Sequence, residues 1–338
     1  MITPTPLMGI VTGYWAFKTL AAAVELDLFG RLAGARVITR AEAEQEFGLP
    51  ERPADLFLAA CASLGLLEKA GDGYRNTELA EQFLVPGRPH YFGGQVRYCD
   101  ERTYLPWHRI TEALRSDKPL TWDPATQESL FTDVDEKMLA LFWAAMYSTS
   151  SFTARSLGEA YDFGGHRRLL DVGGGAGAFP VALCGRFPEL TATIFDLPHV
   201  CAIAETKIAS AGLTDRIGTT AGNFLTDPAL PTGHDVILLS MILHDWDEAQ
   251  NRSILAKCHA ALPPGGTVVI SELLLNDERT GPPAAALMGL NMLVETEGGR
   301  NYSAAEYGTW LTDAGFTDVR TVTFDGPGAN GAVLATRA

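Results

Sequence analysis

The chain has 338 residues, enough for two domains, and 46% of them are hydrophobic while 20% are charged. This composition excludes a disordered or fibrous chain. Lysine and arginine total 26 against 41 aspartates and glutamates, and the net charge of −15 argues against nucleic acid or any other partner held mainly through phosphate contacts.

The N-terminal residues MITPTPLMGIVTGYWAFKTL have no basic region ahead of their apolar residues, and no segment approaches the ~18 apolar residues that a membrane span needs. We therefore expect neither a leader nor a membrane contact. The five cysteines are widely spaced and form no Cys-x-x-Cys pair, which indicates reduced thiols in a cytoplasmic compartment.

Residues 10–83 carry apolar side chains at helical spacing, and glycine and proline divide them into short helices. GLLEKA and YRNT flank Gly71-Asp72-Gly73, a turn sequence that predicts a β-hairpin. Helices followed by such a wing resemble a winged-helix module. Its recognition segment, 51–67, has Arg52 as its one cation, so dimerisation or packing is favoured over DNA binding.

Aromatic side chains are frequent at two further places. The stretch from Tyr14 to Val24 is either core or a dimer contact. The connecting region 88–161 predicts long helices over 104–115 and 137–160, the second after an acidic first turn at Asp133, Asp135 and Glu136. Its aromatic residues either line a substrate pocket or form interdomain core.

From Arg168 onward, apolar runs alternate with helical stretches: RRLLDV, ATIFD, RIGTTAG, HDVILLSMIL, TVVISELLL, DVRTVTF and GAVLATRA. β-rich runs separated by helices predict a doubly wound α/β sheet that is covered on both faces. The last two runs leave no room for a helix between them, so we expect them to form an antiparallel hairpin appended to a parallel sheet.

A glycine-rich turn follows the first of these strands. LLDVGGGAG fits the pattern DxGxGxG, but the same glycines fit the dinucleotide fingerprint GxGxxG/A, so a nicotinamide-dependent oxidoreductase stays an alternative. Asp171 at the strand end would repel a pyrophosphate and attract an amino cation, which favours S-adenosylmethionine. Asp196, 25 positions later, is placed to accept hydrogen bonds from ribose hydroxyls.

Six landmarks then follow in order along the chain: LLDVGGGAGAFPVAL, FDLPHV, AGNFL, HDW, LPPGG and EGGRNYSAAEY. In this order they resemble the plant-type, caffeate-like small-molecule O-methyltransferases and their bacterial natural-product relatives, over essentially the whole chain. The resemblance implies an α/β fold with a Rossmann-like, seven-stranded methyltransferase sheet in residues 162–338. It places a mostly helical winged-helix dimerisation domain in residues 1–87 and a helical connector in residues 88–161.

The resemblance also implies S-adenosyl-L-methionine as cofactor, S-adenosyl-L-homocysteine as product and a homodimer formed through the N-terminal domain. The cofactor positions that match are Asp171, Gly173, Gly175, Asp196, Leu197, Asn223, Phe224, Ser240, Met146 and Ser150. Two of them depart from the family pattern, because Asn223 stands where relatives usually have aspartate and Ser240 where plant members often have lysine. The acceptor positions that match are Phe142, Met288, Asn291 and Met292, with Trp143 and Trp107 as weaker candidates.

His244 opens HDWDE at the end of an apolar strand, the place where open α/β sheets carry their chemistry. We predict that it is the general base, with Glu272 orienting it and Asp245 helping, although a satisfied strand-end polar residue is the alternative. Asn301 stands where plant members carry a second catalytic glutamate, so a weaker base would suit an acidic acceptor. The histidines show no HxxxH or HExxH pattern, and we expect no metal.

The sequence thus predicts an S-adenosylmethionine-dependent methyltransferase that modifies a phenol hydroxyl or a carboxylate of a small aromatic acceptor. Methylation of carbon, nitrogen or sulfur on the same scaffold is an alternative, because the cofactor half of the site is indifferent to the attacking atom. A winged-helix regulator that senses a small ligand is a third class, and the acidic charge balance opposes it.

Overall fold

The computed structural model describes residues 2–127 and 136–338. The chain divides into two compact units, Met1–Leu105 and Pro106–Ala338, and each is described by itself. The finer division at residues 87 and 161 stays a prediction.

The first unit is helical apart from one hairpin. Its elements are α1 (Thr5–Val11), α2 (Gly13–Glu25), α3 (Leu28–Arg31), α4 (Arg40–Phe47), α5 (Glu51–Ser63), β1 (Leu67–Ala70), β2 (Gly73–Asn76), α6 (Glu78–Phe83), α7 (Gly93–Tyr98) and the π-helical η1 (Cys99–Thr103). Antiparallel β1 and β2 pair Ala70 with Gly73, which confirms the predicted hairpin and its turn. Gly71 has a φ of 58°, a conformation that glycine adopts without strain. Leu28, Phe29 and Leu58 lie at the centre of the core.

Helices α1 and α2 leave a set of large apolar side chains in solvent: Leu7, Met8, Ile10, Val11, Tyr14 and Trp15. Together α1 and α2 form a 21-residue stretch, Thr5–Glu25, that is long and apolar enough to cross a membrane by length and composition. The expectation that no segment approaches this size was therefore wrong. Threonine and glycine interrupt the run of apolar residues, so a count of consecutive apolar positions missed this stretch. Its mean hydropathy is nevertheless high enough for a membrane span.

The second unit carries the sheet. Its helices are α9 (Ile110–Ser116), α10 (Glu136–Ala160), η2 (Phe163–Gly165), α11 (Ala178–Arg186), α12 (Pro198–Ser210), η3 (Leu243–Asp245), α13 (Glu248–Ala261), α14 (Pro283–Glu295) and α15 (Ala304–Asp313), and α8 (Tyr104–His108) spans the boundary between the units. Its strands are β3 (Arg168–Val172), β4 (Thr191–Asp196), β5 (Ile217–Ala221), β6 (Val236–Ser240), β7 (Thr267–Glu272), β8 (Phe316–Thr323) and β9 (Gly331–Arg337).

The predicted helix over 104–115 is two helices, because the backbone leaves the helical region at Arg109 (φ −101°, ψ 14°). Pro106 precedes this break and removes one helical hydrogen-bond donor. The helix predicted over 137–160 is confirmed as α10. Of its expected acidic first turn, Asp133 and Asp135 lie outside the described residues.

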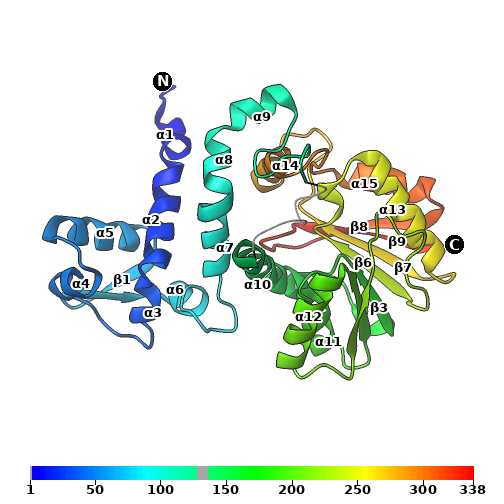
Figure 1. Cartoon of the computed structure of the whole chain (residues 1–338), viewed down its shortest axis with the longest axis horizontal. Coiled ribbons are helices and arrows are strands. Elements are labelled where there is room, and N and C mark those ends of the chain that lie inside the picture. The colour runs from blue at the N-terminus through cyan, green and yellow to red at the C-terminus, as the bar shows by residue number, and fades with distance from the viewer. Residues whose placement is uncertain (1, 128–135) are drawn as a thin grey trace. The chain divides into compact units, whose positions relative to one another are not determined.

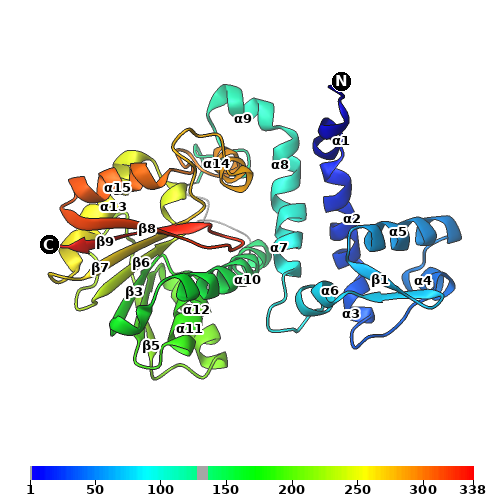
Figure 2. The same ribbon diagram turned by 180° about the vertical axis from the view of Figure 1, so that it is seen from behind.

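The seven strands run in the order β5-β4-β3-β6-β7-β9-β8 (Figures 1 and 2). The first five strands in this order are parallel, while β9 is antiparallel to both β7 and β8, which confirms the predicted terminal hairpin. Side chains of α10, α11 and α12 pack on one face of the sheet, and those of α13 and α15 pack on the other. Both faces of the central strands are therefore buried, as continuous apolar strands require, while the edge strands β5 and β8 are largely exposed.

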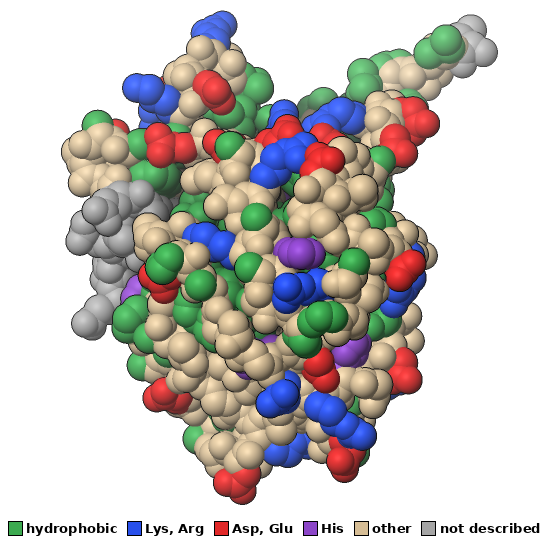
Figure 3. Space-filling model, turned by 90° about the vertical axis from the view of Figure 1, so that its right-hand side faces the viewer, with side chains coloured by type: hydrophobic (Ala, Val, Ile, Leu, Met, Phe, Trp, Pro, Cys, Tyr) green, Lys and Arg blue, Asp and Glu red, His purple; other side chains and the backbone are tan. Residues whose placement is uncertain are grey.

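The parallel strands end at one edge of the sheet, and four of them place a polar side chain there. Asp171 lies near the end of β3, and Asp196, Ser240 and Glu272 are the last residues of β4, β6 and β7. All except Ser240 are buried. On the face drawn in Figure 3, by contrast, basic and acidic side chains are interspersed with apolar ones. The carboxyl edge of the sheet is thus where buried acids gather.

Candidate active site

The turn after β3 is built from glycines for which no larger residue would fit. Gly173 and Gly175 have φ angles of 68° and 56°. A Cβ atom at Gly173 would lie 2.5 Å from Ile242 Cδ1, and one at Gly175 would lie 2.7 Å from the ring of Trp143. The turn therefore exposes bare backbone at the carboxyl edge of the sheet, directly before α11. Such a turn can cradle the polar part of a ligand.

Two buried aspartates flank this turn. Asp196 accepts hydrogen bonds from the backbone N–H groups of Gly175 (2.8 Å) and Leu197 (2.7 Å), so the predicted cofactor residue Leu197 holds the carboxylate through its main chain. Burial raises the pKa of Asp196, and these two hydrogen bonds oppose the rise. Asp171 is more isolated, because its Oδ2 has no hydrogen-bond partner among the described residues. Burial, with the charge of Asp196, raises the pKa of Asp171 to about 8.

Asn223 shapes its own loop. Its Oδ1 accepts a hydrogen bond from Leu225 N (2.9 Å), while its backbone N–H donates to Asp227 Oδ2 (3.0 Å). Phe224 packs edge-to-face on Trp246, with 6.1 Å between the ring centroids, and lies beside Gly173. Asn223 is therefore held by local turn chemistry, while Phe224 is held by its contact with Trp246.

Sequence reasoning missed Lys257, which supports the same loop from α13. Its Nζ donates to the carbonyl oxygens of Phe224 (2.8 Å) and Leu225 (2.9 Å). No local signal marks this lysine, because it lies more than thirty positions beyond the loop it holds. It is the tertiary anchor of the segment that carries Phe224.

Lys257→Met is expected to weaken binding of S-adenosylhomocysteine about tenfold, because two carbonyls lose a charged donor worth roughly 1.5–3 kcal/mol. Isothermal titration calorimetry measures this directly. Lys118→Met, an exposed lysine of the same unit, is the matched control and should bind normally. Unchanged affinity in Lys257→Met would show that the loop keeps its position without the lysine.

His244 lies in η3, just past the end of β6, and is 5% exposed. Glu272, from the end of β7, accepts hydrogen bonds at Oε1 from the backbone N–H groups of Ile242 and Leu243, both at 3.0 Å. Its Oε2 lies 2.6 Å from His244 Nδ1. Because Nδ1 is engaged by a carboxylate, the proton is held on Nδ1 and Nε2 is the nitrogen left to accept another proton. Asp245 Oδ1 lies 3.5 Å from Nε2.

The charges around His244 decide its protonation. Burial alone lowers its pKa, but the carboxylates of Glu272 and Asp245 outweigh burial and raise it to about 9. Burial raises the pKa of Asp245 to about 6, although His244 lowers it. The site therefore stabilises a positively charged imidazole, which is the state that a general base reaches after it takes a proton.

Asn291 of α14, a predicted acceptor residue, lies in a hydrogen-bonded row with Trp107 of α8 and Glu295. Trp107 Nε1 donates to Asn291 Oδ1 (2.7 Å), and Asn291 Nδ2 donates to Glu295 Oε2 (3.2 Å). Met292 is buried, and Met288 packs against Leu273, Leu275 and Ala285. An apolar wall with a few fixed polar groups suits a flat organic acceptor.

The remaining predicted residues are spread over three elements. Phe142 and Trp143 form an edge-to-face pair at 5.0 Å on α10, and Trp143 lies against Gly175 of the glycine turn. Met146 and Ser150 follow on α10 and are partly buried. Ser240 Oγ is buried without a hydrogen-bond partner among the described residues. Asn301 is buried and donates from Nδ2 to the carbonyl oxygen of Leu273 (2.6 Å).

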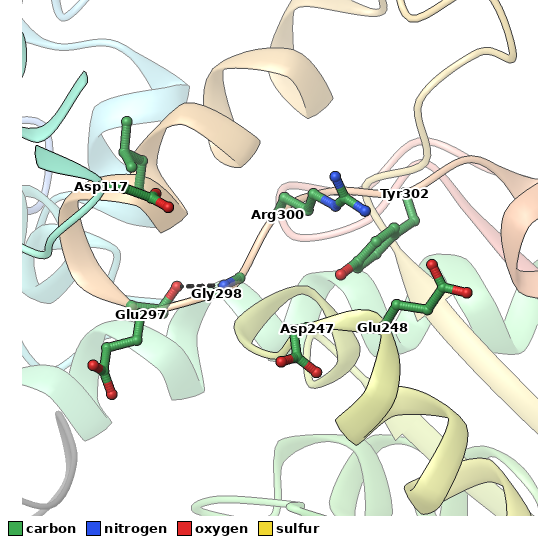
Figure 4. Close-up of a pocket in the computed structure, with 10 residues that line it drawn as sticks. Asp117, Asp247, Glu248, Glu297, Gly298, Arg300 and Tyr302 are labelled. Carbon is green, nitrogen blue, oxygen red and sulfur yellow. Dashed lines mark hydrogen bonds between the residues drawn. The ribbon is translucent and has the colours of Figure 1, made fainter. Parts of the chain in front are cut away.

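A separate acidic pocket lies beside η3 (Figure 4). Its labelled carboxylates are Asp117, Asp247, Glu248 and Glu297, around Arg300 and Tyr302. Asp247 caps α13 in a capping box with Gln250. Within residues 2–127 and 136–338 the structure shows no cluster of three metal-ligating side chains.

Comparison with known proteins gives one consistent result. Residues 107–317 match the model of an O-methyltransferase domain, and residues 8–86 match that of an O-methyltransferase dimerisation domain. The chain is 51% identical to 3-hydroxy-5-methyl-1-naphthoate 3-O-methyltransferase of Streptomyces sahachiroi, over 99% of this chain and 96% of the relative. It is 33% identical to the N,N-dimethyltransferase OxyT of Streptomyces rimosus, over 92% and 90%. Human N-acetylserotonin methyltransferase, solved in complex with SAM, superposes with a TM-score of 0.87 at 30% identity, over 99% of this chain and 97% of that one.

Proposed function

The chain belongs to the family of S-adenosylmethionine-dependent O-methyltransferases, and we propose that it methylates a phenolic hydroxyl of a small fused-ring aromatic acid, with His244 as the general base. The observation that carries the proposal is the buried His244–Glu272 pair, 2.6 Å apart at the carboxyl edge of the sheet. The relative that shares 51% of its residues acts on a hydroxynaphthoate, which supports this acceptor class.

The residues at the glycine turn fit S-adenosylmethionine. Its amino cation matches Asp171, whose Oδ2 is buried without a partner among the described residues, and its ribose hydroxyls match Asp196. The positive φ angles of Gly173 and Gly175 turn the backbone at the strand end, where main-chain groups can meet the methionine part. When bound, the cofactor supplies an electrophilic methyl group on a sulfonium sulfur. The protein's task is then to align the acceptor oxygen with that methyl and exclude water, which is worth ~7–11 kcal/mol of the barrier.

The charges at the base favour a hydroxyl over a carboxylate as the reacting group. Asp245, Glu272 and Glu295 all raise the pKa of His244, so negative charge already surrounds it. A carboxylate acceptor placed here would be repelled, whereas a neutral hydroxyl would lose its proton to Nε2 as attack begins. Glu272 holds the ring in place from the far side throughout.

The test is transfer of labelled methyl from S-adenosylmethionine to a panel of hydroxynaphthoates, simple phenols, carboxylic acids, thiols and amines. Label in an alkali-stable ether of a phenol is the expected result. Methanol released by mild alkali would reveal a methyl ester, and labelled amine would assign the chain the chemistry named for OxyT; either result would overturn the proposed acceptor.

We also propose that the protein is a cytoplasmic homodimer that associates through α1 and α2. The match to a dimerisation domain and the exposed apolar side chains of these helices support the dimer. None of the five cysteines forms a disulfide and four of them are buried, which is in keeping with a reducing compartment.

Ile10→Asp with Trp15→Asp is expected to convert the dimer to monomer, because each substitution would bury a charge in the apolar interface. A loss of about 2 kcal/mol or more per site weakens association at least 30-fold. Analytical ultracentrifugation over a concentration series measures it. Leu56→Asp, which changes an exposed leucine of α5, is the control. A double variant that stays dimeric would move the interface elsewhere.

A further inference from the structure

Glu295 is a carboxylate buried at the end of α14, which is costly unless something holds it. Asn291, one turn earlier, donates to its Oε2 at 3.2 Å, and Asn291 is itself fixed by Trp107. The main chain is fixed as well, because Trp122 Nε1 donates to the carbonyl oxygen of Glu295 at 2.6 Å. Three aromatic and amide side chains thus set the position of one acid.

The end of α14 is packed against the loop that carries His244. Helix α14 contacts η3, and the segment after it lies so close that a Cβ atom at Gly299 would be 2.5 Å from the carbonyl oxygen of His244. Glu295 also interacts electrostatically with both His244 and Asp245 and raises the pKa of each. The held carboxylate therefore belongs to the surroundings of the base.

Asn301 does not supply a charge at this place. Its amide is neutral, and its Nδ2 is committed to the carbonyl oxygen of Leu273. Gly289 of α14 packs on it, since a Cβ atom there would lie 3.2 Å from Asn301 N. Its role in the structure is to join α14 to the end of β7.

We propose that Glu295 is a positioning residue for His244, and that its carboxylate, fixed through Asn291, adds a further negative charge beside those of Glu272 and Asp245 that stabilises the imidazolium after proton abstraction. Glu272 holds the ring at Nδ1, and Glu295 adds charge from a different element. The expected effect of Glu295 on the rate rests on the proposed function. Its expected effect on the pKa of His244 does not, because that pKa can be measured in the cofactor-free protein.

The charged groups that act on His244 come from three elements. Glu272 approaches from β7, Asp245 from η3 itself and Glu295 from α14. Tyr307 of α15 faces Glu272 and Asp245, and burial, with Glu272, raises its pKa well above 10, so it stays neutral throughout the range of the test. Among the described residues, the charged groups that act on the pKa of His244 are therefore these three carboxylates.

The test is Glu295→Gln, which keeps the shape of the side chain and its hydrogen-bonding capacity but removes the charge. Its matched control is Glu297→Gln, two residues later and exposed. The pKa of His244 is followed by NMR of the ring Cε1–H in the cofactor-free protein, with its signal assigned by comparison with His244→Asn. We expect the pKa to fall by about one unit in Glu295→Gln and not in Glu297→Gln.

Kinetics supply the second readout. In Glu295→Gln we expect the acid limb of the profile of kcat/KM against pH to move to lower pH by about one unit. We also expect kcat to fall about tenfold, while the KM for S-adenosylmethionine stays unchanged. An unchanged His244 titration would overturn the inference even if activity fell. A shifted titration in an enzyme whose rate is indifferent to His244→Asn would keep the electrostatic inference and reject the proposed base instead.

Discussion

Replacing His244 by alanine is expected to lower kcat by ~10²–10⁴, because the acceptor hydroxyl loses its positioned base in the step where the oxygen attacks. Binding of S-adenosylhomocysteine should stay within about twofold, since the glycine turn and its two aspartates are untouched. Single-turnover methyl transfer at saturating cofactor measures the first quantity, and calorimetry measures the second.

The rate of His244→Ala is compared with that of a control variant. His108→Ala, at an exposed histidine, should leave the rate unchanged. If His244→Ala kept nearly the full rate, the acceptor would need no base, as an already ionised acidic phenol would allow. Proximity and alignment alone would then carry the reaction.

The pH dependence follows from the raised pKa of His244. A base acts only when neutral, so below a pKa of about 9 the rate should rise with pH, up to tenfold per unit, and level off above it. A cation bound nearby lowers this pKa, so the profile of the cofactor-saturated enzyme should level off at a lower pH than the titration of the free protein. His244→Ala should remove this slope.

The second large effect concerns Asp171 and the affinity for S-adenosylhomocysteine. In the free protein Asp171 has a pKa of about 8 and is protonated at neutral pH. The amino cation of the ligand stabilises the carboxylate, so binding should expel a proton. Affinity is then expected to rise about tenfold per pH unit between pH 6 and 8. Calorimetry in two buffers of different ionisation enthalpy measures the released proton.

Asp171→Asn is expected to bind more weakly at pH 8 and to lose both the proton release and the pH slope. Asp215→Asn, at an exposed aspartate, is the control and should keep both. An Asp171→Asn protein that still released a proton would assign the linkage to another group, such as the amino group of the ligand.

The raised pKa values of Asp171 and His244 both make the folded protein less stable as pH rises. Folding raises the pKa of Asp171 from 3.8, so the folded protein holds a proton that the unfolded chain has released, and this contribution to stability is lost as pH rises towards 8. The raised pKa of His244 adds stability that is present below about pH 6.5 and lost as pH rises to about 9. Bound ligand should therefore raise the melting temperature more at pH 8 than at pH 6.

Much of this arrangement could be predicted from sequence because its signals are local. The Gly71-Asp72-Gly73 turn, the apolar strands and the closing hairpin are set by residues that are neighbours along the chain. The placement of His244 and Glu272 at two strand ends follows from the rule that parallel strands finish at one edge.

What could not be predicted depends on contacts between distant segments. Nothing near Lys257 shows that it binds the Phe224 loop, and nothing near Trp143 shows that it lies on Gly175. The Trp107–Asn291–Glu295 row joins residues almost two hundred positions apart. The break at Arg109 was missed because the pattern of apolar residues continues across it.

The order of the strands also separates two groups of site residues along the chain, one before and one after the segment 225–235. The predicted cofactor residues from Asp171 to Phe224 come from β3, β4 and the loops after β3, β4 and β5, while His244, Glu272 and α14 come from the segments that begin with β6. A chimera joined between residues 225 and 235 would therefore exchange His244, Glu272 and α14 and retain the glycine turn, Asp196 and the Phe224 loop. Contacts that cross that joint include Gly173 with Ile242, Lys257 with the Phe224 loop, Trp107 with Asn291 and the pairing of β3 with β6, and a library of such chimeras would have to keep all of them compatible.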